Sequence, residues 1–390
     1  MGALLRSIRE KFYTQWSWWL LLLTFALTFF SPDRGAARNL YRVLVALPVL
    51  LMLSGPVLKG FFANMPMRWF AAVSIYFSVT LLWSAEFRVL DNHLLRILSV
   101  WAFAFLLYYL AQFRPVLFSQ IDTALVILGA IWVVLLIADW NSLWQMNPSF
   151  DRWEIKRGAF SHHRHVGWML AVLALLSVQR TFSECSTRYA WALVSVSFVV
   201  VLFLAQARGG LLVFIAGLFA YFYVHCRRLN GRLITKIIVG LSCVIGGLLI
   251  LTPDLVESLV DRGVAGRFSI WQNWISMWQE SDIKMVFGYG LGSSTVNLVG
   301  SHPVAHFHNF YLNTIYYGGV VGFTLTLGWF FSLAKFVYKE KALESPWIPV
   351  VVGVFAGFMT DGDSMFNYPG AFTFCFILPV FCLSLKTVRL

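Results

Sequence analysis

Residues 189–225, YAWALVSVSFVVVLFLAQARGGLLVFIAGLFAYFYVH, decide the fold class. They contain two apolar runs, 189–205 and 209–225, each close to the roughly 20 residues with which a helix crosses a bilayer. Between the runs lies a tight turn that carries Arg208. The stretch therefore predicts two membrane-spanning helices joined by a short turn.

The rest of the chain repeats this pattern. Of its 390 residues, 59% are hydrophobic and only 12% are charged, whereas soluble domains average about 45–50% and about 25%. This composition excludes a soluble globular protein. It predicts an all-α integral membrane protein with about twelve transmembrane helices, near 16–31, 43–58, 67–83, 94–111, 117–138, 165–179, 189–205, 209–225, 233–252, 310–334, 347–361 and 368–385.

The net charge of +12 would suggest nucleic acid in a soluble protein. In a membrane protein, Lys and Arg instead mark the cytoplasmic loops. If both termini are cytoplasmic, the whole basic excess falls on that side and the outer segments are balanced. Arg34, Arg38 and Arg42 in the first outer loop run against this trend. We expect no nucleic-acid partner.

The spans organise the chain as one membrane domain. Residues 1–252 carry the first nine helices, 253–309 form a large outer loop, and 310–390 carry the last three. None of the five cysteines falls in an outer loop, so no disulfide framework is implied. The cytoplasmic loops are too short to fold alone, so chemistry is expected in the membrane or at its outer face.

Two outer arginines are candidates for binding an anion. Arg208 lies at the mouth of a span, where an ionisable side chain is by default a functional candidate; a snorkelling interfacial arginine is the alternative. Arg267 opens an amphipathic helix, 268–278, predicted to lie on the outer leaflet. Its N-terminus would suit a phosphate, or the helix is a simple anchor. Its apolar face carries Trp271, Trp274 and Trp278.

Two further motifs close the large loop. His308 directly precedes a span and could take a proton from a hydroxyl; a structural, hydrogen-bonded histidine is the alternative. The segment 287–294, which begins Phe-Gly-Tyr-Gly, resembles a G-x-G-x-G phosphate loop, but no strand precedes it. We interpret it as a turn leaving the surface helix.

The cluster His162, His163 and His165 raises the question of a metal. Adjacent histidines seldom converge on one ion, and neither cysteine nor a close carboxylate joins them, so no metal site is expected. Arg164 is a further cation for an anionic ligand. The outer carboxylates closest to a span could orient His308 or an arginine, or only mark a loop; they are Asp361 and Asp363.

These motifs together resemble the bacterial O-antigen ligases. His308-Asn309, nine residues, and then Gly319-Val320-Val321-Gly322 fit the family pattern H-[NSQ]-x9-G-x-x-[GTY]. The segment 207–210 resembles the S-R-G element, while 266–271 and 287–290 resemble the G-R-x-x-x-W and F-G-x-G elements. Residues 157–160 are also similar. The resemblance covers about residues 155–325.

The resemblance implies a membrane-embedded glycosyltransferase fold of the C type. Such ligases transfer a polysaccharide from undecaprenyl diphosphate to a sugar of the lipid A core, on the periplasmic face of the bacterial inner membrane. The resemblance also implies that the transfer inverts the configuration at the anomeric carbon and needs neither a metal nor another cofactor. By motif, His308 corresponds to the essential histidine, Arg208 and Arg267 to the essential arginines, and Arg164 to a further one.

For substrate binding we expect Asn309, Trp271 and Asp361 to contribute, with membrane lipids as neighbours. The diphosphate leaving group develops charge that guanidinium groups can stabilise, and His308 would deprotonate the acceptor hydroxyl. The hypothesis is a single displacement without a covalent enzyme intermediate.

Two alternatives stay open. O-antigen polymerases share the donor and topology, but their R-x10-G pattern is absent at Arg267, where the eleventh residue onward is Trp278, and at Arg152, where it is His163. A transporter of anionic solutes usually places ionisable groups near the midplane on repeated broken helices. Here the candidates lie at the outer boundary and no repeat is evident.

Overall fold

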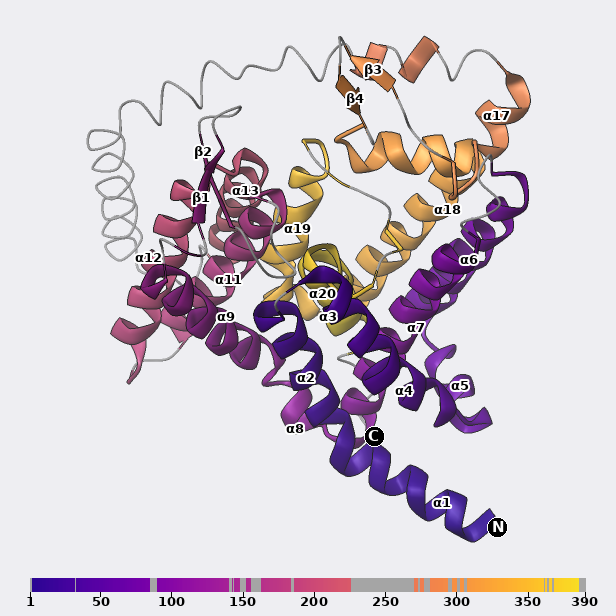
Figure 1. The fold of residues 1–390 in the computed structure, drawn as a ribbon. Coiled ribbons are helices and arrows are strands. Elements are labelled where there is room, and N and C mark those ends of the chain that lie inside the picture. Colours follow the sequence, from indigo (N-terminus) through magenta and orange to yellow (C-terminus); the bar gives the residue numbers. More distant parts are fainter. Residues whose placement is uncertain are drawn as a thin grey trace.

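The computed structural model (Figure 1) describes much of the chain, and every structural statement below refers to that part. Side chains are described for most of it. The described residues are 2–31, 33–84, 90–139, 142, 144–147, 152–155, 163–183, 186–225, 270–272, 274–276, 281–293, 297–299, 302–304, 307–360, 362, 365–366 and 368–385.

Long apolar helices dominate the described part, as expected of a multi-pass membrane protein. Six are long and apolar enough to cross a bilayer, and a bent pair would make seven. The six are α6 (Met65–Thr80) with η3 (Leu81–Trp83), α7 (Leu90–Phe113), α9 (Ile121–Ala138), α11 (His163–Ser183), α13 (Arg208–His225) and α18 (Phe310–Lys339).

Three shorter apolar elements pack among them. They are α12 (Arg188–Leu204), α19 (Trp347–Gly357) and the continuous η6 (Thr373–Ile377) and α20 (Leu378–Leu385). The predicted span 233–252 lies outside the described residues. The predicted total of twelve therefore stays a prediction, although most of the individual spans coincide with a helix.

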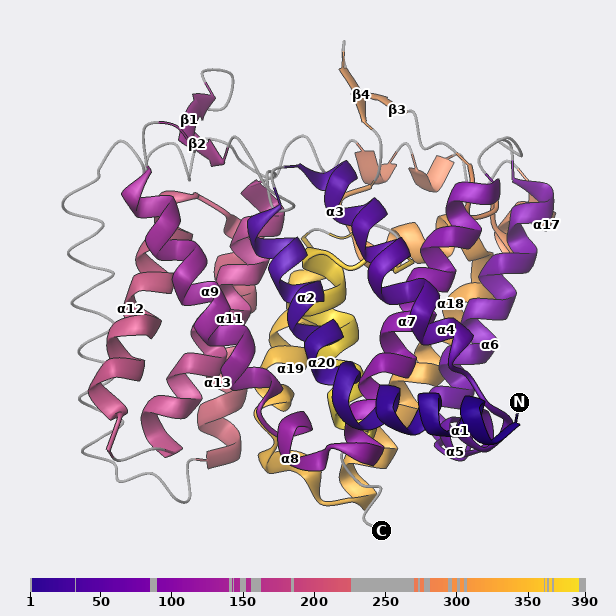
Figure 2. The same ribbon diagram turned by 60° about the horizontal axis from the view of Figure 1, so that its bottom comes forward.

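The N-terminal segment is helical from its second residue. It consists of α1 (Gly2–Lys11), the π-helical turn η1 (Phe12–Trp16) and α2 (Ser17–Phe30). Figure 2 shows α1, α5 (Gly55–Phe61), the short α8 (Pro115–Phe118) and the C-terminal end of the chain at one end of the bundle. This end matches the side that the charge distribution predicts to be cytoplasmic.

The second span differs from the prediction. A helix runs without interruption through α3 (Arg34–Tyr41), η2 (Arg42–Ala46) and α4 (Leu47–Leu51), and α5 then departs at 101°. A straight span over 43–58 is thus wrong. The apolar run continues through the break at 52–54, so composition alone places the helix too far along the chain.

Two small β-hairpins modify the all-α expectation. Strand β1 (Trp144–Asn147) pairs antiparallel with β2 (Arg152–Ile155), and β3 (Asn297–Val299) pairs antiparallel with β4 (His302–Val304). Figure 2 shows both hairpins, together with α3, at the end of the bundle opposite α8. We call this the hairpin end.

Glycines bring helices into close contact near the hairpin end. A Cβ on Gly210 would lie 2.4 Å from the carbonyl oxygen of Gly167, so α13 and α11 touch backbone to backbone. A Cβ on Gly353 would lie 2.3 Å from the carbonyl oxygen of Val213, which brings α19 equally close to α13. Without Cβ atoms these three helices form one tightly packed layer.

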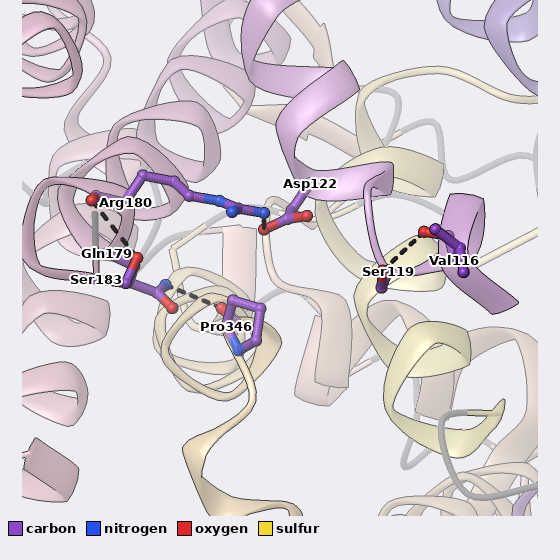
Figure 3. A network of polar contacts seen from close by, with 7 residues as sticks. All are labelled: Val116, Ser119, Asp122, Gln179, Arg180, Ser183 and Pro346. Carbon is purple, nitrogen blue, oxygen red and sulfur yellow. Dashed lines mark hydrogen bonds and ion pairs between the residues drawn. The ribbon is translucent and has the colours of Figure 1, made fainter. Parts of the chain in front are cut away.

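A buried ion pair joins helices at the opposite end (Figure 3). Arg180 of α11 donates from Nη2 to the Asp122 carboxylate of α9 at 2.7 Å, and the Asp122 side chain is only 7% exposed. Beside it, Gln179 donates from Nε2 to the carbonyl oxygen of Pro346 at 2.9 Å. The ion pair thus ties α9 to α11, and Gln179 ties α11 to the start of α19.

Candidate functional site

His308 lies at the entrance to α18 in an unusual backbone conformation. Its φ is 50°, in the left-handed region that non-glycine residues rarely adopt. Its side chain is half-buried, between the buried residues Phe307 and Asn309. A conformation of this kind persists only where the surroundings hold it, so the neighbouring contacts define the histidine's position.

Asn309 supplies the first of these contacts as the N-cap of α18. Its Oδ1 accepts hydrogen bonds from the backbone N–H groups of Tyr311 at 2.9 Å and Leu312 at 3.1 Å. Its Nδ2 donates to the carbonyl oxygen of Met359 at 3.2 Å. Asn309 was expected to bind substrate, but here its amide is engaged with backbone. Through it, the residue after His308 is fixed to the end of α19.

A second set of bonds joins the same two segments. The backbone N–H of Phe310 donates to the carbonyl oxygen of Phe358 at 3.0 Å. Asn313 donates from Nδ2 to the carbonyl oxygen of Gly362 at 2.6 Å, and its Oδ1 accepts from the backbone N–H of Phe307 at 3.3 Å. Asn313 was not singled out in the sequence, because an asparagine one turn into a helix gives no motif signal.

Trp271 holds the other side of the histidine loop. Residues 270–272 and 274–276 are helical, which confirms the predicted helix in its described part. The Trp271 indole donates from Nε1 to the carbonyl oxygen of Phe307 at 3.1 Å. Trp274 is 4% exposed and packs with Phe307 and Tyr316. Trp274 is therefore buried against protein and the half-buried Trp271 packs beside it, whereas both were expected on the lipid surface.

Gly319, the tenth residue of α18, interrupts the helix. Its φ of 64° and ψ of −165° are non-helical, and the helix kinks there (Figure 1). The interruption frees carbonyl groups: Tyr76 donates its hydroxyl to the carbonyl oxygen of Gly318 at 2.6 Å. The first glycine of the G-x-x-G segment is thus required by the backbone conformation.

The Phe-Gly-Tyr-Gly segment docks into this interruption. It follows α17 (Asp282–Phe287) as a turn in which Gly288 and Gly290 have positive φ. The N–H of Tyr289 donates to the carbonyl oxygen of Tyr316 at 2.8 Å, and that of Gly290 to the carbonyl oxygen of Tyr317 at 3.0 Å. The predicted turn is confirmed, and it ends α17 rather than the helix near 270.

Arg208 begins α13 after a tight turn. Gln206 in this turn has a φ of 48° and is buried. A Cβ on the next glycine, Gly209, would lie 3.0 Å from the Trp168 Nε1 and 3.4 Å from the Thr360 Oγ1. The glycines after Arg208 thus allow α11 and the residues after α19 to approach the backbone at the start of α13 closely.

The last turn of α19 joins the two candidate residues. Phe358 stacks on Phe310, two residues after His308, with ring centroids 4.1 Å apart. On its other side Phe358 packs against Trp168, at 5.6 Å, and Trp168 adjoins the backbone after Arg208. The Arg208 turn and the His308 turn therefore flank the same short segment, 358–360.

The remaining predicted site residues are only partly placed. Arg164 belongs to the first turn of α11, with only its backbone described. Arg267 and Asp361 lie outside the described residues, as do His162 and Asp363. In the part that the structure covers, no three His, Cys, Asp or Glu side chains are grouped closely enough to hold a metal ion.

Comparison with known families bears directly on this site. No curated protein matches the sequence significantly. A family model described as O-antigen ligase, however, matches residues 193–327. Over this segment the chain is similar to the O-antigen ligase family. The segment includes the Arg208 turn, Arg267, Trp271, the Phe-Gly-Tyr-Gly turn and the whole His308–Gly322 motif, so the resemblance predicted from the sequence is confirmed.

Much of the O-antigen ligase motif is structural in this chain. Asn309 caps a helix, Gly319 interrupts it, and the turn at 287–290 fills the interruption. The family covers both ligases and polymerases of lipid-linked polysaccharides. The described part of the chain thus has the helices of a multi-pass membrane protein and the motif of this O-antigen ligase family.

Proposed function

We propose that the protein transfers an O-antigen polysaccharide from undecaprenyl diphosphate to a sugar of the lipid A core oligosaccharide, at the periplasmic face of the bacterial inner membrane. The observation that carries this proposal is the placement of Arg208 and His308 on either side of residues 358–360, within the segment that matches the O-antigen ligase family. An anion-binding group and a proton acceptor are thereby available at the same end of the bundle.

His308 is proposed as the general base. Asn309 and Asn313 fasten its loop to the end of α19, and Trp271 fastens it to the outer segment. A base must be held within hydrogen-bond reach of the proton that it removes. The restraints on both sides of the His308 backbone support this role, because they hold the residue in place while its half-buried ring keeps an accessible side.

Arg208 and Arg267 are proposed to bind the diphosphate, with Arg164 as a further cation. Guanidinium groups match phosphate oxygens in pairs and keep their charge. In the proposed step, the acceptor oxygen bonds to the anomeric carbon and His308 takes its proton. The bond to the diphosphate breaks at the same time, and the leaving diphosphate keeps the electron pair and is stabilised by the arginines.

The surroundings of the site suit two lipid-linked substrates. The site lies at one end of a bundle of apolar helices, so membrane lipids surround it and both substrates can keep their lipid in the bilayer. The hairpin end would face the periplasm, because the basic excess of the sequence lies at the other end. Trp271 and Asp361 remain proposed contributors to substrate binding at this face.

The test is transfer by purified protein reconstituted in lipid, given polyprenyl-diphosphate-linked glycan and the lipid A core. His308→Asn is the informative variant, because asparagine tolerates the left-handed conformation better than other residues and cannot act as the base. We expect folded protein with at least a hundredfold slower transfer. Full transfer by the variant would refute the proposed base.

A polymerase that extends the lipid-linked glycan is the second candidate, because the matched family includes both activities. Deletion of the gene separates them. Loss of a ligase leaves long polymer on the lipid carrier, whereas loss of a polymerase leaves single repeat units attached to the core. The first outcome supports the proposed function, and the second replaces it.

A further inference from the structure

Four arginines gather at the hairpin end on helices that the site described above does not use. Arg34, Arg38 and Arg42 follow one another at four-residue spacing, which places them on one face of the continuous helix α3–η2. Arg96 comes from α7. Tyr41 donates its hydroxyl to the carbonyl oxygen of Ser99 at 3.0 Å, so α3 and α7 are fastened together at this level.

Contacts show that the four side chains share one space. The positive charges of Arg38 and Arg96 repel that of the Arg42 guanidinium. Arg42 donates a hydrogen bond from Nη2 to Asn92 Oδ1 at 3.4 Å. The Arg34 guanidinium carbon lies 5.7 Å from the centre of the Tyr368 ring. Burial raises the pKa of Tyr368, while Arg34, Arg38 and Arg96 act to lower it. The phenol therefore contacts Arg34 and lies within electrostatic reach of Arg38 and Arg96.

This charge is unbalanced within the described residues. None of the four arginines forms an ion pair with a described acid. The Nε atoms of Arg38, Arg42 and Arg96 are buried and have no hydrogen-bond acceptor. Like charges on neighbouring turns repel one another, and buried donors in proteins are normally satisfied. Among the described residues, the cluster thus lacks a partner anion with several acceptor oxygens.

The position of the arginine cluster relative to the lipid-facing side chains indicates the depth at which that anion would bind. On the opposite face of the same helix, apolar side chains at helical spacing are turned outward: Leu40 is 44% exposed, Val43 61%, Leu44 44% and Leu47 52%. A stripe of this kind faces lipid in a membrane protein. Arg38 and Arg42 therefore lie at the depth where a bilayer begins, which is the level of lipid phosphates.

We propose that Arg34, Arg38, Arg42 and Arg96 form a second phosphate-binding site that takes the phosphorylated headgroup of a lipid. Guanidinium forks pair with phosphate oxygens, and several of them together distinguish a phosphate monoester, which carries more charge, from a zwitterionic headgroup. The site is built by α3, η2 and α7, whereas Arg208 belongs to α13. It does not depend on the proposed transfer reaction.

The experiment measures lipid retention by the purified full chain in nanodiscs of phosphatidylcholine doped with phosphatidic acid. Native mass spectrometry counts the phosphatidic acid that stays bound. The test variant is Arg38→Gln with Arg42→Gln, and the matched control is Arg114→Gln, an exposed arginine at the opposite end. We expect at least tenfold weaker retention in the double variant and no change in the control. Equal retention by wild type and double variant overturns the proposal.

Two further arms make the result specific. Inorganic phosphate is titrated against bound phosphatidic acid: a lipid site keeps its phosphatidic acid, whereas complete displacement at millimolar phosphate shows a free-phosphate site and overturns the assignment to a lipid. His308→Asn is assayed in parallel and should retain phosphatidic acid as wild type does. Failure of the transferase proposal and failure of this one are thereby distinguished.

Discussion

Gly288 and Gly319 occupy the space that each other's side chain would need. A Cβ on Gly288 would lie 2.5 Å from the backbone nitrogen of Gly319, and a Cβ on Gly319 would lie 2.5 Å from that of Gly288. Both residues have positive φ. Two glycines that belong to separate sequence motifs are therefore halves of one contact, in which the turn after α17 enters the interruption of α18.

The first prediction concerns this contact. Gly319→Ala should destabilise the protein by about 1–3 kcal/mol, because the residue would keep a conformation that suits only glycine and would clash with the Val286 carbonyl. The thermal midpoint in detergent, followed by tryptophan fluorescence, measures it. Gly55→Ala is the control, since nothing lies within 4 Å of the added atom; equal losses in both would contradict the assignment.

The second prediction distinguishes the structural role of Asn309 as the N-cap of α18 from a direct role in binding substrate. Asn309→Ala should lower stability by about 0.5–2 kcal/mol, because the N–H groups of Tyr311 and Leu312 lose their acceptor. Asn309→Ser keeps a capping oxygen and should recover most of the loss. If transfer follows stability across the pair, Asn309 positions His308. A serine variant that is stable but inactive would instead favour direct contact with substrate.

The third prediction addresses the arginine at the start of α13. Arg208→Lys keeps the charge but loses the paired geometry toward a diphosphate, so transfer should slow by about tenfold to a hundredfold. Rates are measured with saturating donor in the reconstituted system. Arg114→Lys, at the opposite end, should transfer at the wild-type rate. A fully active Arg208→Lys would show that charge alone is sufficient.

The fourth prediction tests the buried pair between α9 and α11. Arg180→Ala should cost about 1–3 kcal/mol, because the Asp122 carboxylate would stay buried without its partner. Adding Asp122→Asn removes the unpaired buried charge and should restore part of the decrease in the thermal midpoint. If the double variant is instead less stable than Arg180→Ala, the unpaired buried charge of Asp122 does not explain the loss of stability, and the prediction is wrong. Transfer by the folded variants should be unchanged.

The positions of most helices could be predicted because apolar content alone specifies them. The predicted span 310–334 lies within α18, and the predicted span 117–138 overlaps α9 (Ile121–Ala138). The second span was predicted too far along the chain because its apolar run continues past the 101° bend. Arg34, Arg38 and Arg42 were therefore assigned to a loop, although they face α7 from within a helix.

The motifs pointed to the candidate residues, but the structural roles of these residues depend on contacts between distant segments. An asparagine before an apolar run is a recognisable N-cap signal, so the role of Asn309 was accessible from the sequence. The interlock of Gly288 with Gly319 was not, because it depends on α17 docking against α18. Burial of Trp274 against Phe307 was missed for the same reason: an amphipathic face does not reveal whether lipid or protein covers it.

The interruption at Gly319 gives α18 two mechanical parts. Residues before it carry the His308 loop and are fastened to α19 and the outer segment, while residues after it pack in the bundle with α6. At the kink, the carbonyl oxygens of Tyr316, Tyr317 and Gly318 accept hydrogen bonds from groups outside the helix. The orientation of the segment that carries the His308 loop therefore depends on the turn at 287–290, which fills the interruption, as well as on α18 itself.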